Sequence, residues 1–171
     1  VGSRDCSQQG VASVQKIIKE MGNYFVVVSG LARGIDTASH IAAMKNGGKT
    51  IAVIGTGLDV NYPRENYQLQ AYIAKNHLLL SEYGPGDKPL KYHFPERNRI
   101  IAGLSRGVLV TEAKLRSGSL NTCERALEEG RDVFAIPGNI VDQLSDGCHH
   151  LIQEGAKLVY HGRDILREYD R

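Results

Sequence analysis

The sequence predicts an α/β domain with a mostly parallel sheet and helices on both faces. Short apolar runs rich in valine, isoleucine and leucine alternate with segments in which apolar residues recur every three or four positions. Glycine, serine and threonine follow most of these runs, as they do where parallel strands turn into helices. The chain has 171 residues, enough for a single domain over residues 1–171 with a sizeable core.

In the first half of the chain, each expected helix has a recognisable boundary. The first carries apolar residues at helical spacing and stops at Gly22, a common C-terminal cap; Gly47 and Gly48 stop the second, and Pro63 precedes the third. The intervening apolar runs are typical of strands buried on both faces. The expected order is helix 7–21, strand 24–28, helix 35–45, strand 50–54, helix 64–75 and strand 77–80.

The second half repeats this alternation after a loop that contains two prolines. Pro95 suits the first turn of the next helix, and Ser119 precedes another helical segment. The expected order is helix 95–104, strand 107–110, helix 120–129, strand 132–136, helix 147–154, strand 157–160 and a short terminal segment from residue 164.

The overall composition excludes several classes of protein. A net charge of +2 indicates no polyanion partner by itself, so a basic surface must come from local clustering. Cys6, Cys123 and Cys148 are odd in number and far apart, which argues against a disulfide framework and a zinc site and fits a reducing cytosol. No stretch is apolar enough to span a membrane. We expect a cytoplasmic protein with no metal, no cofactor and no membrane partner.

The carboxyl ends of the strands carry the chemistry. Ligands of an open α/β sheet lie at this edge, and here glycines and small hydroxyl residues alternate with arginines. Glycines let the backbone approach an anion, free N–H groups at helix starts bind it, and the arginine fork suits phosphate. We predict a site for a chain of phosphates. Its candidate residues are Gly2, Ser3, Arg4, Ser29, Gly30, Arg33, Gly34, Arg64, Lys91, Arg97, Arg99, Lys114, Ser117, Gly118 and Ser119.

Other site chemistries find little support. The dinucleotide fingerprint begins at Gly55 and Gly57 but fails at Val60, where a third glycine is needed. No nucleophile motif is present, and His149 and His150 are adjacent, so on a helix they cannot chelate one metal together.

One histidine and several loop aromatics lie close in sequence to the proposed edge. His40 is expected to be a packed, hydrogen-bonded core histidine. Tyr62, Tyr83, Tyr92 and Phe94 lie in loops near the proposed edge, where they form small local cores or stack on bases.

Several motifs in a fixed order resemble the DNA-processing protein A family, also called Smf. The resemblance covers essentially the whole chain, with departures at Asn121, Thr122, Cys123 and His149. The motifs are Val1–Arg4, Ser29–Asp36, Gly55–Asp59, Phe94–Ser105, Glu112–Ala113, Ser117–Leu120, Pro137–Asn139 and Leu151–Ala156.

The resemblance implies an extended Rossmann-like domain that binds single-stranded DNA and catalyses no reaction. Such proteins protect incoming strands during natural transformation and load the recombinase RecA, displacing single-strand-binding protein. The resemblance also implies a homodimer through His149, Leu151, Ile152 and Leu158. We expect an N-terminal domain and the start of the first strand to be missing here, and no winged helix.

The helix at 120–129 presents Glu124 and Leu127 as the expected RecA contact. Two alternatives stay open. One is a nucleotide phosphoribohydrolase of the lysine-decarboxylase-like group, whose phosphate loop matches residues 117–124 in length, although Leu120 and Asn121 replace its glycine and threonine. The other is an interaction scaffold that binds no nucleic acid.

Overall fold

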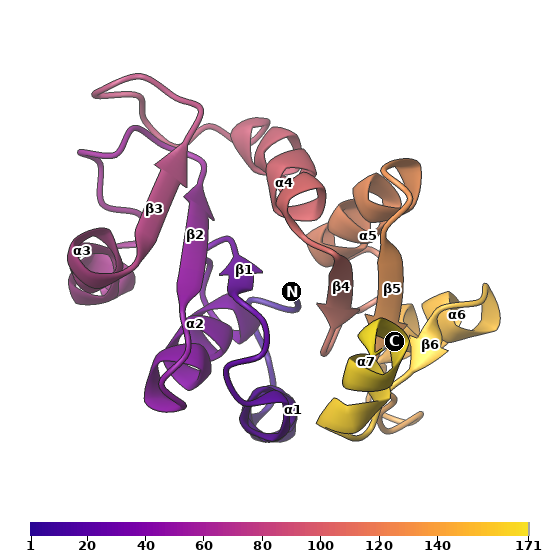
Figure 1. The fold of residues 1–171 in the computed structure, drawn as a ribbon. Helices are drawn as coiled ribbons and strands as arrows, with labels where there is room; N and C mark the ends of the chain where they lie inside the picture. The colour runs from indigo at the N-terminus through magenta and orange to yellow at the C-terminus, as the bar shows by residue number, and fades with distance from the viewer. Residues whose placement is uncertain (171) are drawn as a thin grey trace.

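The computed structural model describes residues 1–170, and the predicted α/β alternation is confirmed (Figure 1). Its elements are α1 (Gln8–Met21), β1 (Val27–Ser29), α2 (Ile35–Lys45), β2 (Thr50–Ile54), the 3-10 helix η1 (Arg64–Asn66), α3 (Tyr67–Asn76), β3 (Leu78–Ser81), α4 (His93–Leu104), β4 (Gly107–Val110), α5 (Gly118–Glu128), β5 (Asp132–Ala135), α6 (Asp146–Gln153), β6 (Lys157–Leu158) and α7 (Gly162–Tyr169). No helix within residues 1–170 is long and apolar enough to cross a membrane.

The strands form two three-stranded sheets, where the sequence predicts one. The orders are β1-β2-β3 and β4-β5-β6, and every pairing is parallel. Figure 1 shows β1 and β4 facing each other, with the N-terminus between them and α4 above. A cavity of about 410 Å³ separates these strands, with Val28 and Leu109 among its apolar lining residues.

Val1 makes the last rung of a parallel ladder on β4. Its amino group donates to the carbonyl of Leu109 at 2.9 Å, and the N–H of Thr111 donates to the carbonyl of Val1 at 3.0 Å. These two hydrogen bonds are those of a parallel pairing between Val1 and β4.

Small residues bring the helices close to the second sheet. Ala102, Cys123, Ala126 and Ala135 are fully buried in one cluster with β4. Close packing of such residues leaves little room for shifts, so α4 and α5 are held firmly against each other and against the sheet.

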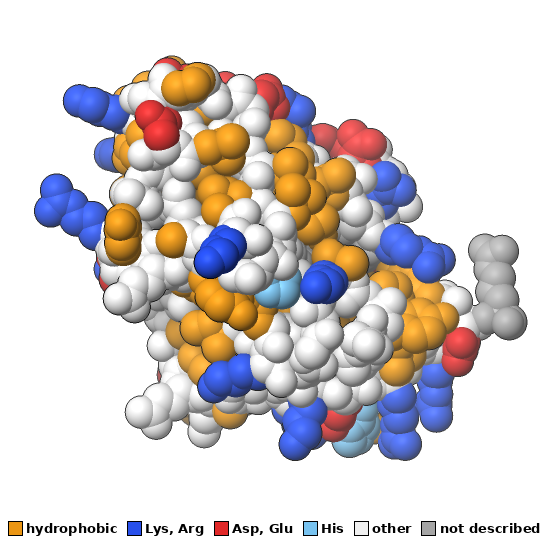
Figure 2. Space-filling model, turned by 60° about the vertical axis from the view of Figure 1, so that its left-hand side comes forward, with side chains coloured by type: hydrophobic (Ala, Val, Ile, Leu, Met, Phe, Trp, Pro, Cys, Tyr) orange, Lys and Arg blue, Asp and Glu red, His pale blue; other side chains and the backbone are white. Residues whose placement is uncertain are grey.

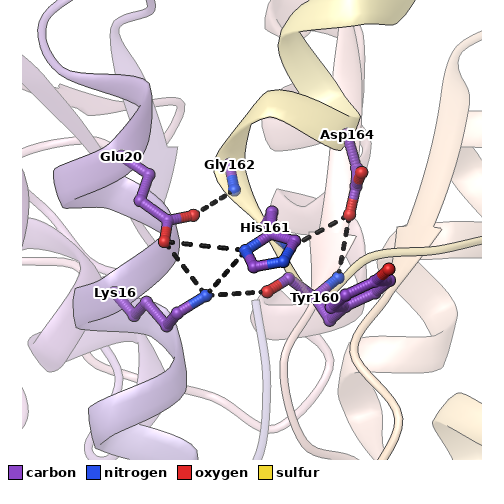
Figure 3. Close-up of polar contacts among 6 residues, drawn as sticks. All are labelled: Lys16, Glu20, Tyr160, His161, Gly162 and Asp164. Atoms are coloured by element: carbon purple, nitrogen blue, oxygen red, sulfur yellow. Dashed lines mark hydrogen bonds and ion pairs between the residues drawn. The ribbon is translucent and has the colours of Figure 1, made fainter.

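Polar contacts tie the first helix to the last (Figure 3). Lys16 donates to the carbonyl of Tyr160 at 2.8 Å, and Glu20 accepts the N–H of Gly162 at the start of α7. Asp164 accepts the N–H of Tyr160 at 3.1 Å and that of His161 at 3.0 Å, which satisfies donors at the helix entry. The hydrogen bond from Gly162 is the main reason that the pKa of Glu20 is lowered.

Candidate functional site

Two segments far apart in sequence meet at the carboxyl end of β1. The N–H of Ile35 donates to the carbonyl of Ser3 at 3.2 Å, which joins the start of α2 to the N-terminal turn. Gly34 has φ of 79°, and a Cβ there would lie 2.3 Å from the oxygen of Ser3, so this approach requires glycine. Arg4 and Arg33 are therefore brought to one place.

The two arginines line the same small pocket. It has a volume of about 30 Å³ and is lined by Arg4, Gly30, Leu31, Ala32, Arg33, Ile54, Gly55, Tyr62, Pro63 and Phe94. The guanidinium carbon of Arg4 lies 5.5 Å from the centre of the Phe94 ring, a cation–π distance. The Tyr62 ring centre is also 5.5 Å from that of Phe94. The pocket thus combines cations with aromatic faces.

Glu112 fixes the turn that carries Arg4. Its buried carboxylate accepts the N–H of Ser7 at 2.8 Å and the Ser7 hydroxyl at 2.6 Å, at the N-terminus of α1. Its carbonyl accepts the N–H of Ser3 at 2.7 Å. A carboxylate is favoured at the positive end of a helix, so Glu112 joins β4, α1 and the turn.

The remaining basic candidates lie on the surface, except one. Arg33 is paired with Glu65 at 3.3 Å, and Arg99 is paired with Glu82. Exposed pairs contribute little free energy, so a phosphate can replace the carboxylate in each. Arg4, Arg64, Lys91 and Lys114 are exposed and have no ion pair within residues 1–170.

Figure 2 shows one face of the molecule, on which basic side chains stand apart among neutral and apolar surface. They form no continuous patch in this view. This distribution agrees with the small net charge of +2.

Arg97 does not lie where the sequence predicts. It is 5% exposed, and its Nη1 donates to the carbonyls of Gly30 and Val53, each at 2.7 Å. A guanidinium that donates to two carbonyls inside the protein is not available to a phosphate. The prediction that Arg97 contacts phosphate directly is therefore wrong. Ser29 is also buried, at 1% exposure, and does not line the pocket, so direct contact between its hydroxyl group and a phosphate is not supported either.

The loop after β4 reaches the same edge from the second sheet. Ser117 caps α5, accepting the N–H of Ser119 at 3.3 Å, and the two hydroxyl groups lie 2.7 Å apart. Gly118 is exposed and Ser119 is buried. A helix N-terminus with small residues is suited to an anion, and contact of this segment with phosphate stays a prediction.

Two residues that support the site were missed as such from the sequence. Asp36 is buried and accepts the N–H of Gly30 at 3.2 Å and that of Ala32 at 3.3 Å. His93 is buried, contacts the carbonyl of Gly55 through Nδ1 at 2.8 Å and stacks on Tyr83. An acidic residue just inside the helix after the glycine turn was the available signal for Asp36.

The residues expected to contact protein partners lie on the second half of the chain. Glu124 and Leu127 are exposed on α5, and Leu158 is 41% exposed on β6. His149 accepts the N–H of Gly138 at 3.1 Å through Nε2. Leu151 and Ile152 are half-buried and pack on the core of the second sheet.

Residues 1–170 contain no cluster of histidine, cysteine, aspartate or glutamate that could hold a metal ion. The parallel strands, the helices that cover them and the arginines at the carboxyl end of β1 define a Rossmann-like α/β domain with an edge suited to phosphates. Residues 1–170 match the family model of DNA recombination-mediator protein A, and the chain belongs to this family.

Curated members of the family are close to this chain in sequence. DNA processing protein DprA of Streptococcus pneumoniae is 72% identical over 170 residues, which are 99% of this chain and 60% of the relative. That of Bacillus subtilis is 50% identical over 169 residues, covering 98% of this chain and 57% of the relative. The chain thus spans about 60% of the length of these curated relatives.

Solved structures give the same result. The X-ray structure of the Streptococcus pneumoniae protein superposes with a TM-score of 0.98 at 71% identity, covering all of this chain and 60% of that one. DNA processing protein A from Helicobacter pylori, described by its single-stranded DNA binding mode, gives 0.88 at 29% identity, covering 99% and 77%. A molybdenum cofactor carrier protein of Chlamydomonas reinhardtii, at 13% identity and a TM-score of 0.64, shares the fold alone.

Proposed function

We propose that this domain binds single-stranded DNA at the edge formed by Arg4, Arg33 and Phe94. The observation that carries the proposal is the convergence of two exposed arginines on one pocket with an aromatic wall. The structure of the Helicobacter pylori relative, which is described as binding single-stranded DNA, supports it.

The chemistry of the edge favours a single strand. Arginine forks and free backbone N–H groups, including those of Gly34 and Gly118, pair with phosphates and carry no sequence information. The exposed faces of Tyr62 and Tyr92 offer stacking surfaces to unpaired bases. Arg64, Lys91, Arg99 and Lys114, which are exposed, are the further cations that we assign to phosphates.

The proposed task is that of a recombination mediator. The domain protects incoming DNA in natural transformation and loads RecA in exchange for single-strand-binding protein, in the cytoplasm and without catalysis. Glu124 and Leu127 form the RecA contact, and His149, Leu151, Ile152 and Leu158 form a homodimer contact. The exposure of Leu127 and Leu158 supports these two surfaces, since apolar side chains gain by being covered.

A salt-titrated binding series tests the DNA proposal. Fluorescence anisotropy is measured with a labelled oligothymidine and with a duplex of the same length. The single strand is expected to bind more tightly, and Arg4→Ala and Arg33→Ala each to weaken binding and lower the log–log salt slope by about 0.7. Lys19→Ala, an exposed lysine on α1, is the control and leaves both unchanged. Equal binding by all variants would overturn the assignment, and release of base from nucleoside monophosphates would revive the hydrolase alternative.

The partner surfaces are tested separately from DNA binding. Glu124→Lys is expected to reduce RecA capture on beads, and Leu158→Glu to shift the sedimentation coefficient to that of a monomer. Leu158→Glu with an unchanged sedimentation profile would remove that residue from the dimer contact. Both variants should bind oligothymidine like the unaltered chain, because neither residue lies at the pocket.

A further inference from the structure

We propose that Arg97 is a positioning residue for the single-stranded DNA site, which it serves from inside the protein. This inference rests on the proposed function, because it concerns how the DNA-binding loop is held. Arg97 lies on α4, whereas the loop that it contacts follows β1. The buried guanidinium therefore joins the helix to the ends of two strands.

The contacts of Arg97 show what it holds. The carbonyls of Gly30 and Val53 lie just after the end of β1 and near the end of β2, and Nη1 bridges them at 2.7 Å each. Nε donates to the side chain of Asn98 at 3.2 Å. A buried carbonyl without a donor is costly, so this bridge satisfies two acceptors with one charged group.

Asp36 holds the same residue, Gly30, through the peptide group on its other side. Its carboxylate accepts the N–H of Gly30, while Arg97 donates to the carbonyl of Gly30. The carboxylate also attracts the buried guanidinium and offsets part of the cost of its burial. A Cβ on Gly30 would lie 2.7 Å from Nη1 of Arg97 and 3.0 Å from Oδ2 of Asp36, so the pair occupies the space of a side chain.

The next residue is held as well, which leaves Arg33 at the exposed tip. Leu31 is fully buried at φ of 59°, its N–H donates to Nε2 of His40 at 3.2 Å, and its carbonyl accepts from Asn66 at 2.9 Å. A non-glycine residue in this conformation persists only where its surroundings fix it. Gly30 and Leu31 thus set the direction in which the chain leaves toward Arg33.

Arg97 also lies beside the aromatic wall of the pocket. Its guanidinium carbon is 5.4 Å from the centre of the Phe94 ring, and that of Arg4 is 5.5 Å from the same ring. Arg97 itself does not line the pocket. It acts through the loop that begins at Gly30, and not by touching phosphate.

A double-mutant cycle with Arg33 tests this role. Arg97→Lys keeps the charge but loses the planar fork, and it is expected to weaken oligothymidine binding about tenfold, the effect of one lost charge-assisted hydrogen bond. If Arg97 acts by placing Arg33, removing Arg33 should abolish its effect. The affinity of the double variant Arg97→Lys, Arg33→Ala should then be within about twofold of the affinity of Arg33→Ala alone. Independent effects that multiply would overturn the proposal, and so would wild-type affinity for Arg97→Lys.

A matched control separates positioning from loss of stability. Arg131 also donates to a backbone carbonyl, that of Gly103 at 2.9 Å, but it lies in the second half of the chain. Arg131→Lys is expected to leave DNA affinity unchanged. If the unaltered chain binds no oligothymidine at low salt, the proposed function fails; if it binds and the cycle is additive, only the role of Arg97 fails.

Gly30→Ala approaches the same contact from the other side and covers the case in which Arg97→Lys does not fold. Its methyl group displaces the guanidinium, so the same non-additivity with Arg33→Ala is expected. Gly103→Ala is its control, because a Cβ there meets nothing within 4 Å. Gly30→Ala with wild-type affinity would contradict the proposal.

Discussion

His40 shows how a single buried residue supports the loop that carries Arg33. Nδ1 lies 2.7 Å from the hydroxyl of Thr50, which itself donates to the carbonyl of Val27, so the ring donates at Nδ1. Nε2 accepts the N–H of Leu31. Both nitrogens are used by the neutral ring, as expected for a packed histidine. Burial, together with nearby cations and against the attraction of Asp36, lowers the pKa of His40 to about 4.

Stability is therefore expected to fall as the pH drops from about 6.5 to about 4. In this window the unfolded chain takes up a proton on His40 and the folded chain does not. The loss is on the order of 3 kcal/mol, because each unit of pKa shift corresponds to about 1.4 kcal/mol. Urea unfolding at several pH values measures this loss of unfolding free energy. The variant His40→Gln should be less stable than the unaltered chain at pH 7, but its unfolding free energy should fall less between pH 6.5 and pH 4.

His150→Gln is the control for this measurement, because His150 is exposed. It should follow the pH dependence of the unaltered chain. A His40→Gln variant with the same slope as the unaltered chain would show that another group causes the loss.

Arg97 and Arg99 mark a limit of sequence reasoning at this scale. Helical spacing predicts that they lie on different faces of their helix, and they do: one is buried and the other is exposed. Spacing does not say which one faces inward. The carbonyls that accept from Arg97 lie just after β1 and within β2, more than forty residues away in the sequence, so no local pattern predicts these contacts.

At the scale of elements, strands and helices with clear end signals were predicted well. Helix Ile35–Lys45 and strands Thr50–Ile54 and Gly107–Val110 have their predicted bounds. β1 begins at Val27 and not at residue 24, because Tyr24 and Val26 are exposed and pairing with β2 starts at Val27. An apolar run gives no information on where its partner strand begins.

The junction of α1 and α7 gives a prediction for two elements that the sequence does not pair. Glu20 accepts the N–H of Gly162 and has a lowered pKa, so its contribution is present above the unfolded value of 4.5 and is lost as the pH falls through the lower folded value. Glu20→Gln is expected to cost about 0.5–1 kcal/mol at pH 7, since the contact is partly solvated. The difference from the unaltered chain should narrow below pH 4.5 in urea unfolding.

Glu128→Gln is the comparison, because Glu128 forms an exposed ion pair with Arg125 and its carboxylate accepts no backbone N–H from residues 1–170. Its effect should stay within a few tenths of a kcal/mol. Equal losses in the two variants would mean that the bond to Gly162 adds nothing beyond a surface charge pair.

At the scale of the molecule, the site was predictable as an edge and not as a pocket. Parallel strands place their carboxyl ends together, so residues after β1 and β4 were expected to be neighbours. Contact between Ser3 and Ile35 depends on the exact path of the N-terminal turn, which Glu112 fixes from another strand. Long-range hydrogen bonds of this kind cannot be predicted from the periodicity of a sequence.

The division into two sheets gives a prediction about the cavity between β1 and β4. Val1 already pairs with β4 in the parallel direction, and Thr111 Oγ1, on the cavity wall, has no hydrogen-bond partner within residues 1–170. A strand continued upstream from Val1 would fill this space and pair with both free edges. Adding five valine and isoleucine residues before Val1 is expected to raise stability by about 1–3 kcal/mol, since apolar burial and ladder hydrogen bonds exceed the ordering entropy.

Thermal unfolding measures this, with a rise of roughly 2–4 °C per kcal/mol for a chain of this size. Binding of an apolar fluorescent dye should fall in parallel, because the cavity closes. A glycine–serine extension of the same length also removes the amino charge at Val1 but brings no apolar surface, so it should leave both measurements unchanged. If the two extensions behave alike, the cavity does not accept a strand, and the two sheets are stable as separate units joined through α4.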